Sequence, residues 1–228
     1  MNAQEATNLF IPSLFTEARV QIIIPSDQPH RSTSRSLPVL LHLYAGPNTQ
    51  MVKDEFTIDI AEYLVSSRHY AAVKIDGRGS GGRGWKYRSA VYGALGTVEI
   101  QDQIDALKAV LKKYPYFDAS RVSVFGWSYG GFAAVRAAEL APESFFKCTV
   151  SVAPVANFLY YDATYTERYM GEAGLAAYNA SDITNDVSHF RKTRLLLAHG
   201  LYDDNVHFQN SALLMEALQR QDIDFDAM

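Results

Sequence analysis

The chain has 228 residues, of which 48% are hydrophobic and 20% are charged, and its formal net charge at pH 7 is −4. This length and composition suit one globular domain that can bury a substantial core. A mildly acidic charge spread along the chain argues against a surface for nucleic acid or for an anionic membrane. No run of about 18 apolar residues predicts a membrane span, and the amino terminus lacks the basic and apolar regions of a secretory signal.

Short apolar runs alternate with amphipathic segments along the chain. Strands are predicted, in chain order, at residues 19–24, 37–44, 70–76, 121–125, 147–153, 193–199 and 222–228. Helices are predicted between them at residues 55–67, 97–113, 132–140 and 206–219. Because strands that alternate with helices form a parallel sheet, the sequence predicts one α/β domain with a mostly parallel central sheet and helices on both faces.

A serine lies between glycines where the predicted strand 121–125 meets the helix after it. The pentapeptide GWSYG (126–130) fits the pattern G-x-S-x-G, which makes a sharp strand-to-helix turn and raises the serine hydroxyl above the sheet. The pattern alone occurs by chance, and a tight structural turn with an incidental serine is the alternative. An apolar strand directly before it and an Ala-rich helix directly after it favour Ser128 as the nucleophile of an α/β-hydrolase fold.

In this fold the triad runs along the chain in the order Ser, acid, His. The predicted strand 193–199 leads into HGLYDDN, which supplies Asp203 and Asp204. Asp203 is the preferred acid. Asp204 is the alternative, and a plain helix-capping role is the structural explanation.

None of the six histidines lies where this order requires a base. His207 follows Asp203 by four residues, whereas the acid and the base of this fold come from different strand ends, which favours a structural role for His207. His199 precedes the acid at a strand end and is expected to be buried and hydrogen-bonded. His42 falls within a predicted strand, and the other histidines lie in polar surroundings: His30, His69 and His189. The base is therefore expected beyond Met228.

The single cysteine, Cys148, excludes a disulfide within these 228 residues. It follows a pair of phenylalanines, so composition favours a small buried hydrophobic side chain. The alternative is a thiol whose partner lies outside the chain.

Seven segments, taken in order, resemble the hydrolase domain of dipeptidyl peptidase IV-like proteins, which are serine peptidases of the prolyl oligopeptidase group. These segments are LYAGPNTQ, DGRGSG, LGTVEIQDQIDA, FGWSYGGF, FKCTVSVAPV, YYDATYTERYMG and HGLYDDNVHFQ. The resemblance implies an α/β-hydrolase domain that pairs with a large β-propeller. It also implies removal of dipeptides from peptide amino termini with Pro or Ala in the second position, without a metal or other cofactor.

The resemblance assigns roles to individual residues. Ser128 corresponds to the nucleophile and Asp203 to the triad acid, while the Tyr44 hydroxyl and the backbone N–H of Tyr129 correspond to the oxyanion hole. The residues that correspond to the proline pocket and to a polar substrate contact are Val155, Phe158, Tyr161, Tyr165 and Asn205. A flat apolar slot lined by aromatic rings suits a rigid pyrrolidine. Ordinary core packing is the alternative for these aromatic residues, since Tyr161 and Tyr165 are helically spaced.

The chain departs from the family pattern in ways that bear on activity. Most of the family has Trp at the position of Phe158. The triad histidine and a closing helix of the family would lie beyond Met228, so the domain is expected to be incomplete at its carboxyl end and inactive by itself. In the family the cysteine corresponding to Cys148 pairs with one in that closing helix, and the glutamates that bind the substrate amino group belong to the propeller.

The resemblance also implies a location and partners. It implies an extracellular or plasma-membrane ectodomain, and the sequon Asn179-Ala180-Ser181 is a candidate glycosylation site. The segment 206–219 resembles the helix through which the family forms homodimers. A generic α/β-hydrolase esterase and a non-catalytic binding relative remain as alternatives, although the presence of Ser128, Asp203 and Tyr44 argues against the latter.

Overall fold

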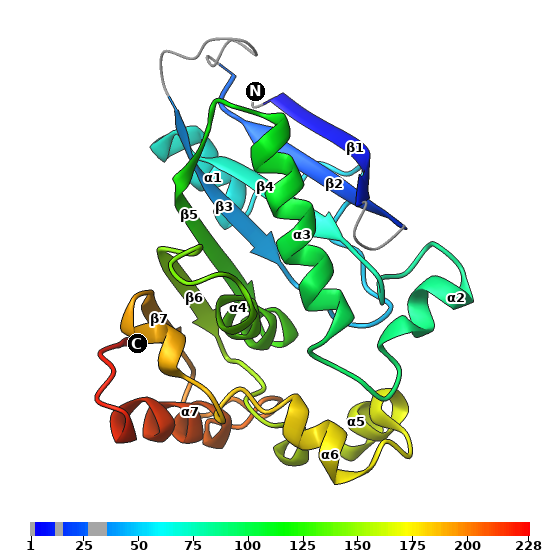
Figure 1. The fold of residues 1–228 in the computed structure, drawn as a ribbon, viewed down its shortest axis with the longest axis vertical. Helices are drawn as coiled ribbons and strands as arrows, with labels where there is room; N and C mark the ends of the chain where they lie inside the picture. Colours follow the sequence, from blue (N-terminus) through cyan, green and yellow to red (C-terminus); the bar gives the residue numbers. More distant parts are fainter. Residues whose placement is uncertain (1–2, 12–15, 27–35) are drawn as a thin grey trace.

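The computed structural model describes residues 3–11, 16–26 and 36–228, which are built around one eight-stranded sheet (Figure 1). The strands are β1 (Ala3–Ile11), β2 (Thr16–Ile24), β3 (Leu37–Leu43), β4 (Ala71–Asp76), β5 (Phe117–Trp127), β6 (Cys148–Val152), β7 (Arg194–Ala198) and β8 (Asp226–Ala227). The helices are α1 (Ile60–Arg68), α2 (Trp85–Arg88), α3 (Val98–Lys113), α4 (Tyr129–Leu140), α5 (Ala163–Met170), α6 (Gly174–Ala180) and α7 (Gln209–Arg220), with 3-10 turns η2 (Ser89–Val91), η3 (Phe158–Tyr160) and η4 (Ser188–Arg191).

The strands follow the order β1-β2-β4-β3-β5-β6-β7-β8 across the sheet. β2 is antiparallel to β1 and β4, whereas β3 to β8 run parallel to one another. Helices lie between successive parallel strands, as crossover connections require. The predicted α/β fold with a mostly parallel sheet is therefore confirmed.

Helices cover the two faces of the sheet with different clusters of side chains. Ile22 and Leu41 belong to the larger core cluster, together with the buried faces of α3 and α4. Their neighbours Ile23 and Leu40 point to the opposite face, where they pack against Ala61 and other residues of α1. Figure 1 shows α3 and α4 in front of the sheet and α1 behind it.

The face that α1 covers is half-exposed over β6 and β7. Phe125 packs beside the α1 cluster, and its lateral neighbours on the same face are Val150 in β6 and Leu196 in β7. Val150 and Leu196 are half-buried, although the alternate residues of both strands are buried. Trp127, on the same face at the end of β5, is 62% exposed. An apolar strip thus crosses three adjacent strands, and the free thiol of Cys148 lies at its end.

Several element boundaries differ from the sequence-based predictions. α1 begins at Ile60 rather than at residue 55, because Asp59 accepts the Ala61 N–H and Glu62 accepts the Asp59 N–H in a capping box. α7 begins at Gln209 rather than at 206. The expected last strand pairs with β7 only at Asp226 and Ala227. β1 was not predicted, and it pairs with β2 along its whole length.

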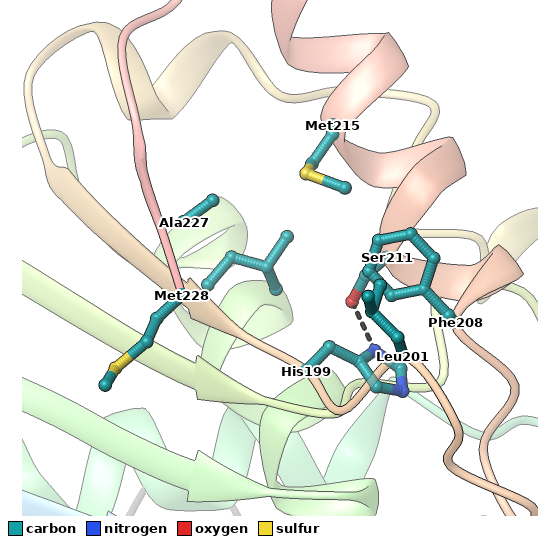
Figure 2. A pocket seen from close by; sticks show the side chains of 8 residues that line it. His199, Leu201, Phe208, Ser211, Met215, Ala227 and Met228 are labelled. Carbon is teal, nitrogen blue, oxygen red and sulfur yellow. Dashed lines mark hydrogen bonds between the residues drawn. The ribbon is translucent and has the colours of Figure 1, made fainter.

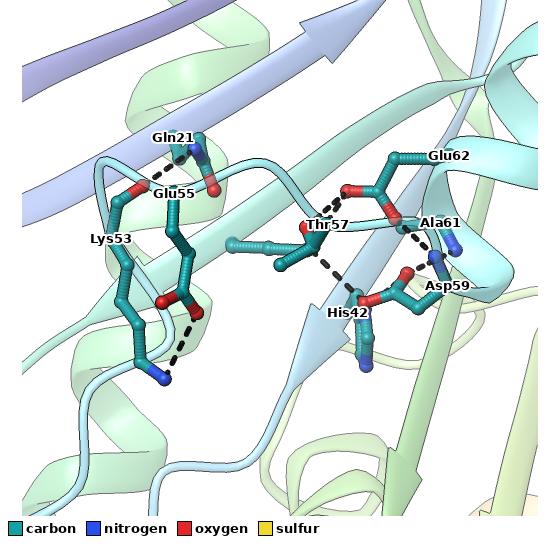
Figure 3. A network of polar contacts seen from close by, with 9 residues as sticks. Gln21, His42, Lys53, Glu55, Thr57, Asp59, Ala61 and Glu62 are labelled. Carbon is teal, nitrogen blue, oxygen red and sulfur yellow. Dashed lines mark hydrogen bonds and ion pairs between the residues drawn. The ribbon is translucent and has the colours of Figure 1, made fainter.

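A buried charged network fixes the start of α1 to the sheet (Figure 3). The Lys74 side chain, on β4, is 5% exposed and lies 3.0 Å from Glu62 Oε1 and 3.3 Å from Asp59 Oδ2. Thr57 donates to Glu62, and His42 Nδ1 lies 3.7 Å from Asp59 Oδ1. Paired carboxylates allow an ammonium group to remain buried among apolar strands.

Candidate active site

Four neighbouring parallel strands end at the same edge of the sheet, and predicted site residues follow them. Tyr44 follows β3, Ser128 follows β5, Val155 follows β6 and Asp203 follows β7. Because these strands are adjacent and parallel, their carboxyl ends line one edge. Ligands of open α/β sheets bind at this kind of edge. The fold thus gathers residues that are about 160 positions apart in the sequence.

Ser128 occupies a strained strand-to-helix turn at the end of β5. Its backbone has φ 59° and ψ −120°, a region that non-glycine residues rarely adopt. A Cβ on Gly126 would overlap the Gly130 carbonyl oxygen, and a Cβ on Gly130 would lie 2.5 Å from the Leu43 carbonyl oxygen. The glycines on both sides of the serine are therefore required by close backbone approach, as the G-x-S-x-G pattern indicates.

The Tyr44 hydroxyl is directed to the serine. Burial raises the pKa of the Tyr44 phenol, and a hydrogen bond with the Ser128 side chain opposes that rise. The phenol is therefore neutral at pH 7 and can donate a hydrogen bond. The turn after it is packed tightly, because a Cβ on Gly46 would overlap the Tyr44 ring. Ser128 itself is half-buried, so its hydroxyl has partial access to solvent.

Asp203 lies in the loop between β7 and α7, where backbone donors orient its carboxylate. Its Oδ1 accepts the N–H groups of Asn205 and Val206, each at 3.0 Å. Its Oδ2 lies 3.6 Å from Nε2 of His199, and the Asp203 side chain is 25% exposed. Both bonds lie within the loop, and α7 begins at Gln209 without a side-chain cap, so the capping alternative is wrong. The two backbone contacts use Oδ1, which leaves Oδ2 for a second partner.

His199 is committed to structural contacts. Its Nδ1 lies 2.6 Å from Oγ of Ser211, and its Nε2 lies 2.7 Å from the Val206 carbonyl oxygen. Figure 2 shows His199 and Ser211 together at the wall of a cavity of about 280 Å³. The other lining residues are Leu197, Leu201, Phe208, Met215, Ala227 and Met228. The predicted buried, hydrogen-bonded role of His199 is confirmed, and neither ring nitrogen is available to deprotonate a serine.

The other described histidines are also placed away from a base position. His42 packs edge-on against Phe125, and His69 ends α1 at the opposite edge of the sheet, where β4 begins. His42 Nδ1 faces Asp59 at 3.7 Å, and both nitrogens of His199 face other residues of the described chain, Ser211 and Val206. His30 lies outside the described residues.

The predicted pocket residues divide into a group with access to solvent, in which Tyr161 and Tyr165 are half-buried and Asn205 is exposed, and a buried group. Tyr161 donates its hydroxyl to Oδ1 of Asn205 at 3.0 Å, and the rings of Tyr161 and Tyr165 meet edge to face at 5.4 Å. Burial raises the pKa of Tyr161, and the nearby Asp162, Tyr44 and Asp203 add to that rise.

Val155 and Phe158 are each 1% exposed. The Phe158 ring packs against the Tyr129 ring, with centroids 5.9 Å apart. Both side chains therefore belong to the core cluster against which the half-buried Tyr161 and Tyr165 pack, as the core-packing alternative expects.

Sequence reasoning missed Glu99, a buried carboxylate bonded to the site. Glu99 is 1% exposed, and its Oε1 accepts the Tyr129 hydroxyl at 2.8 Å. Burial raises the pKa of Glu99, and hydrogen bonds from Gly96 and Tyr129 oppose the rise. In the sequence Glu99 is an acid in the first turn of a helix, which ordinarily indicates a favourable dipole interaction. The apolar neighbours on both sides of it were the available sign of burial.

Across residues 3–11, 16–26 and 36–228, no group of three or more His, Cys, Asp or Glu side chains is arranged to hold a metal ion. No helix in the same ranges combines the length and apolar character that crossing a bilayer requires.

Comparison with known proteins places the chain among peptidases. Dipeptidyl peptidase family member 1 of Caenorhabditis elegans is 57% identical over 213 residues, which are 93% of this chain and 26% of that protein. Venom dipeptidyl peptidase 4 of Vespa velutina is 39% identical over 223 residues, which are 96% of this chain and 28% of that protein. The chain thus spans about a quarter of the length of these curated relatives.

A solved structure and a family match point to the same class of protein as these relatives. The crystal structure of dipeptidyl peptidase 4 from Porphyromonas gingivalis superposes with a TM-score of 0.90 at 38% identity, over 100% of this chain and 31% of that one. The sequence pattern of the prolyl oligopeptidase family matches residues 56–228. This range includes Ser128, Val155 and Asp203, and Tyr44 lies before it. The chain belongs to the prolyl oligopeptidase family.

Proposed function

We propose that this chain is the catalytic domain of a serine-type dipeptidyl peptidase that cleaves through an acyl-enzyme intermediate. Ser128 is the nucleophile, Asp203 is the triad acid, and the Tyr44 hydroxyl with the Tyr129 N–H forms the oxyanion hole. The observation that carries the proposal is the strained backbone of Ser128 beside the Tyr44 hydroxyl. In serine hydrolases such a turn presents the hydroxyl, and a fixed donor stabilises charge on the attacked carbonyl oxygen.

The proposed substrate is a peptide with proline or alanine in the second position. Tyr161 and Tyr165 meet edge to face and would bound a compact pyrrolidine, while Asn205 offers an amide for a substrate carbonyl. Val155 and Phe158 would fix the rings from behind. The names of the relatives support the dipeptidyl class of reaction.

The proposed mechanism needs a histidine that residues 36–228 do not bring to Ser128. His199 is bonded through both nitrogens, so we assign the base to a segment that joins the domain from outside these residues. With the base absent, an enzyme of this class keeps about 10³- to 10⁴-fold rate enhancement over water from binding and the oxyanion hole. Asp203 would hold the imidazole through Oδ2, which the backbone contacts leave accessible.

Hydrolysis of Ala-Pro-p-nitroanilide tests the proposal. Residues 1–228 should give no measurable turnover, and Ser128→Ala should leave this background unchanged. Robust turnover by residues 1–228 that Ser128→Ala abolishes would contradict the assignment of the base and make His207 the candidate. Joining the carboxyl-terminal segment of the C. elegans relative should make Ser128 reactive toward fluorophosphonates, whereas release of the Ala-Pro dipeptide should still require the propeller that supplies the amino-group anchor. With both parts supplied, turnover should depend on Ser128, and a Pro-lacking analogue such as Gly-Gly-p-nitroanilide should be hydrolysed far more slowly.

We further propose an extracellular location, glycosylation at Asn179 and a homodimer that uses the segment 206–219. Asn179 is exposed at the end of α6, and the venom relative supports secretion of some members. Expression through the secretory pathway should give a glycosidase-sensitive mass increase that Asn179→Gln removes.

Sedimentation of the protein should report a dimer. A monomer, or a mass unaffected by glycosidase, would exclude the respective proposal.

A further inference from the structure

A buried carboxylate behind the site has no role in the chemistry proposed above. Glu99 Oε1 accepts the Gly96 N–H at 2.5 Å and the Tyr129 hydroxyl at 2.8 Å, while Oε2 accepts the Thr97 N–H at 3.1 Å. Glu99 is 1% exposed. A carboxylate that is removed from water and bonded to three donors holds those donors in one arrangement.

Tyr129 links this carboxylate to the site. Its backbone N–H follows Ser128 directly and is the proposed oxyanion donor. Its ring meets the Phe132 ring edge to face at 5.2 Å and lies tilted against Phe158 at 5.9 Å and Tyr44 at 6.1 Å. Tyr129 is 2% exposed. The Tyr129 ring is therefore enclosed by three other rings. The hydrogen bond from its hydroxyl to Glu99 fixes the orientation in which it packs against them.

The loop that Glu99 bonds also joins the helices around the site. The Gly96 carbonyl oxygen accepts Nε of Arg136 on α4 at 3.2 Å, and the Gly93 N–H donates to the Tyr169 carbonyl oxygen on α5 at 2.7 Å. Gly96 has φ +79°, and a Cβ there would lie 2.7 Å from the Phe132 ring. The start of α3 is thus fitted against α4 and α5, and Glu99 occupies the point where they meet.

We propose that Glu99 is a positioning residue that sets the shape of the ring-binding pocket through the Tyr129 hydroxyl. The proposal rests on the function proposed above and extends it. When the Tyr129 ring is held in place, the Phe158 and Tyr44 rings that pack against it are held as well. The pocket then keeps one shape, which accepts a closed pyrrolidine better than an open chain of similar size. Glu99 does not contact the reacting atoms.

Two amides that differ in ring closure test the proposal without requiring catalysis. The probes are alanine pyrrolidide and alanine diethylamide, and their binding to residues 1–228 is measured by ligand-observed NMR. The unaltered chain should bind the pyrrolidide roughly 10-fold more tightly, because a pocket held in one shape fits the closed ring better than two free ethyl groups. Tyr129→Phe keeps the ring and removes the hydroxyl, and it should reduce this preference to about 3-fold or less.

Glu99→Gln should give the same loss, since its NH₂ group must face one of three donors. If Glu99 acts through the Tyr129 hydroxyl, the double variant should lose no more preference than the larger single change. Glu139→Gln is the matched control, because Glu139 is a largely buried acid that pairs with Arg136 on α4 instead of with Tyr129. It should retain the full preference, and thermal unfolding of each variant monitors the fold separately.

The outcomes separate the two proposals. If the unaltered chain does not prefer the closed ring, the proposed substrate pocket is wrong, and this inference with it. If the unaltered chain prefers the closed ring, and both Tyr129→Phe and Glu99→Gln show the same preference as the unaltered chain, the role of Glu99 is overturned while the proposed function stands. If Glu99→Gln fails to fold, Tyr129→Phe alone decides, because it keeps every backbone donor and the aromatic packing.

Discussion

Oδ2 of Asp203 lies 3.6 Å from Nε2 of His199, and that same nitrogen is 2.7 Å from the carbonyl oxygen of Val206. The histidine therefore contacts two points of the loop between β7 and α7 that carries Asp203. Because its other nitrogen contacts Ser211, the imidazole connects β7, the acid loop and α7. His199 thus lies beside the proposed triad acid, while its hydrogen bonds go to other residues.

His199→Leu should destabilise the chain by about 2–3 kcal/mol, because it leaves the buried Ser211 hydroxyl and the Val206 carbonyl without their partner. Urea unfolding followed by circular dichroism measures this loss. His207→Leu is the matched control, since His207 is exposed, and it should change the free energy of unfolding by less than about 0.5 kcal/mol. Equal effects of the two changes would contradict the structural role of His199.

Ser128→Gly should be more stable than Ser128→Ala by about 1 kcal/mol, because only glycine adopts φ 59° and ψ −120° without strain. Thermal unfolding of the two variants measures the difference. Ser123, within β5, provides the comparison: there Ser123→Gly should be less stable than Ser123→Ala. A strained nucleophile turn is refuted if glycine is the less stable residue at both positions.

The network at the start of α1 should control stability in acid. Burial raises the pKa of Asp59, but hydrogen bonds with Glu62 and Ala61 and the charges of His42 and Lys74 outweigh it and lower the pKa to about 2. Since this is below the usual 3.8, the stabilisation by Asp59 is complete above about pH 4 and is lost as the pH falls toward 2. Thermal unfolding between pH 2 and 7 follows it.

Asp59→Asn keeps a helix-capping oxygen and removes the charge. Its unfolding temperature should therefore vary less between pH 4 and 2 than that of the unaltered chain, with a loss at pH 7 below about 1 kcal/mol because solvent screens this half-exposed group. Glu55→Gln removes an exposed partner of Lys53 and should leave the pH dependence unchanged. Parallel curves for Asp59→Asn and the unaltered chain would show that Asp59 has no such role.

The two faces of β5, β6 and β7 should respond differently to polar substitution. Val150→Ser and Leu196→Ser lie on the half-exposed strip and should lower binding of a hydrophobic dye, with losses of stability near 1 kcal/mol or below. Val124→Ser and Leu197→Ser lie on the buried face and should cost about 2–4 kcal/mol. Similar losses on both faces would mean that the strip is covered.

The central strands and the sharp turn at Ser128 could be predicted because their causes are local. The apolar residues of β4 indicate a buried strand, although Lys74 and Asp76 are buried in it as well, and the Ser128 turn needs glycines that the sequence displays. The start of α1 could not be derived from periodicity, since Phe56 and Ile58 continue the apolar pattern yet are 86% and 77% exposed. There the capping box of Asp59 decides the boundary.

Other features depend on contacts between distant segments. β1 is held by pairing with β2, and its sequence, AQEATNLFI, has too weak an alternation to indicate a strand. Glu99 acquires its role because α4 brings the Tyr129 hydroxyl to it across 30 positions. The distinction between half-buried Tyr161 and buried Phe158 likewise follows from packing, which residue type does not reveal.

Covalent labelling of Ser128 tests the central claim most directly. The chain is joined to the carboxyl-terminal segment of its C. elegans relative, exposed to a fluorophosphonate, and the rate of mass increase is measured. Labelling should require Ser128, fall by about 10⁴-fold in Asp203→Asn because the histidine tautomer is lost, and change little in Asp204→Asn. A greater loss in Asp204→Asn than in Asp203→Asn, or labelling that survives Ser128→Ala, would contradict the assignment of nucleophile and acid.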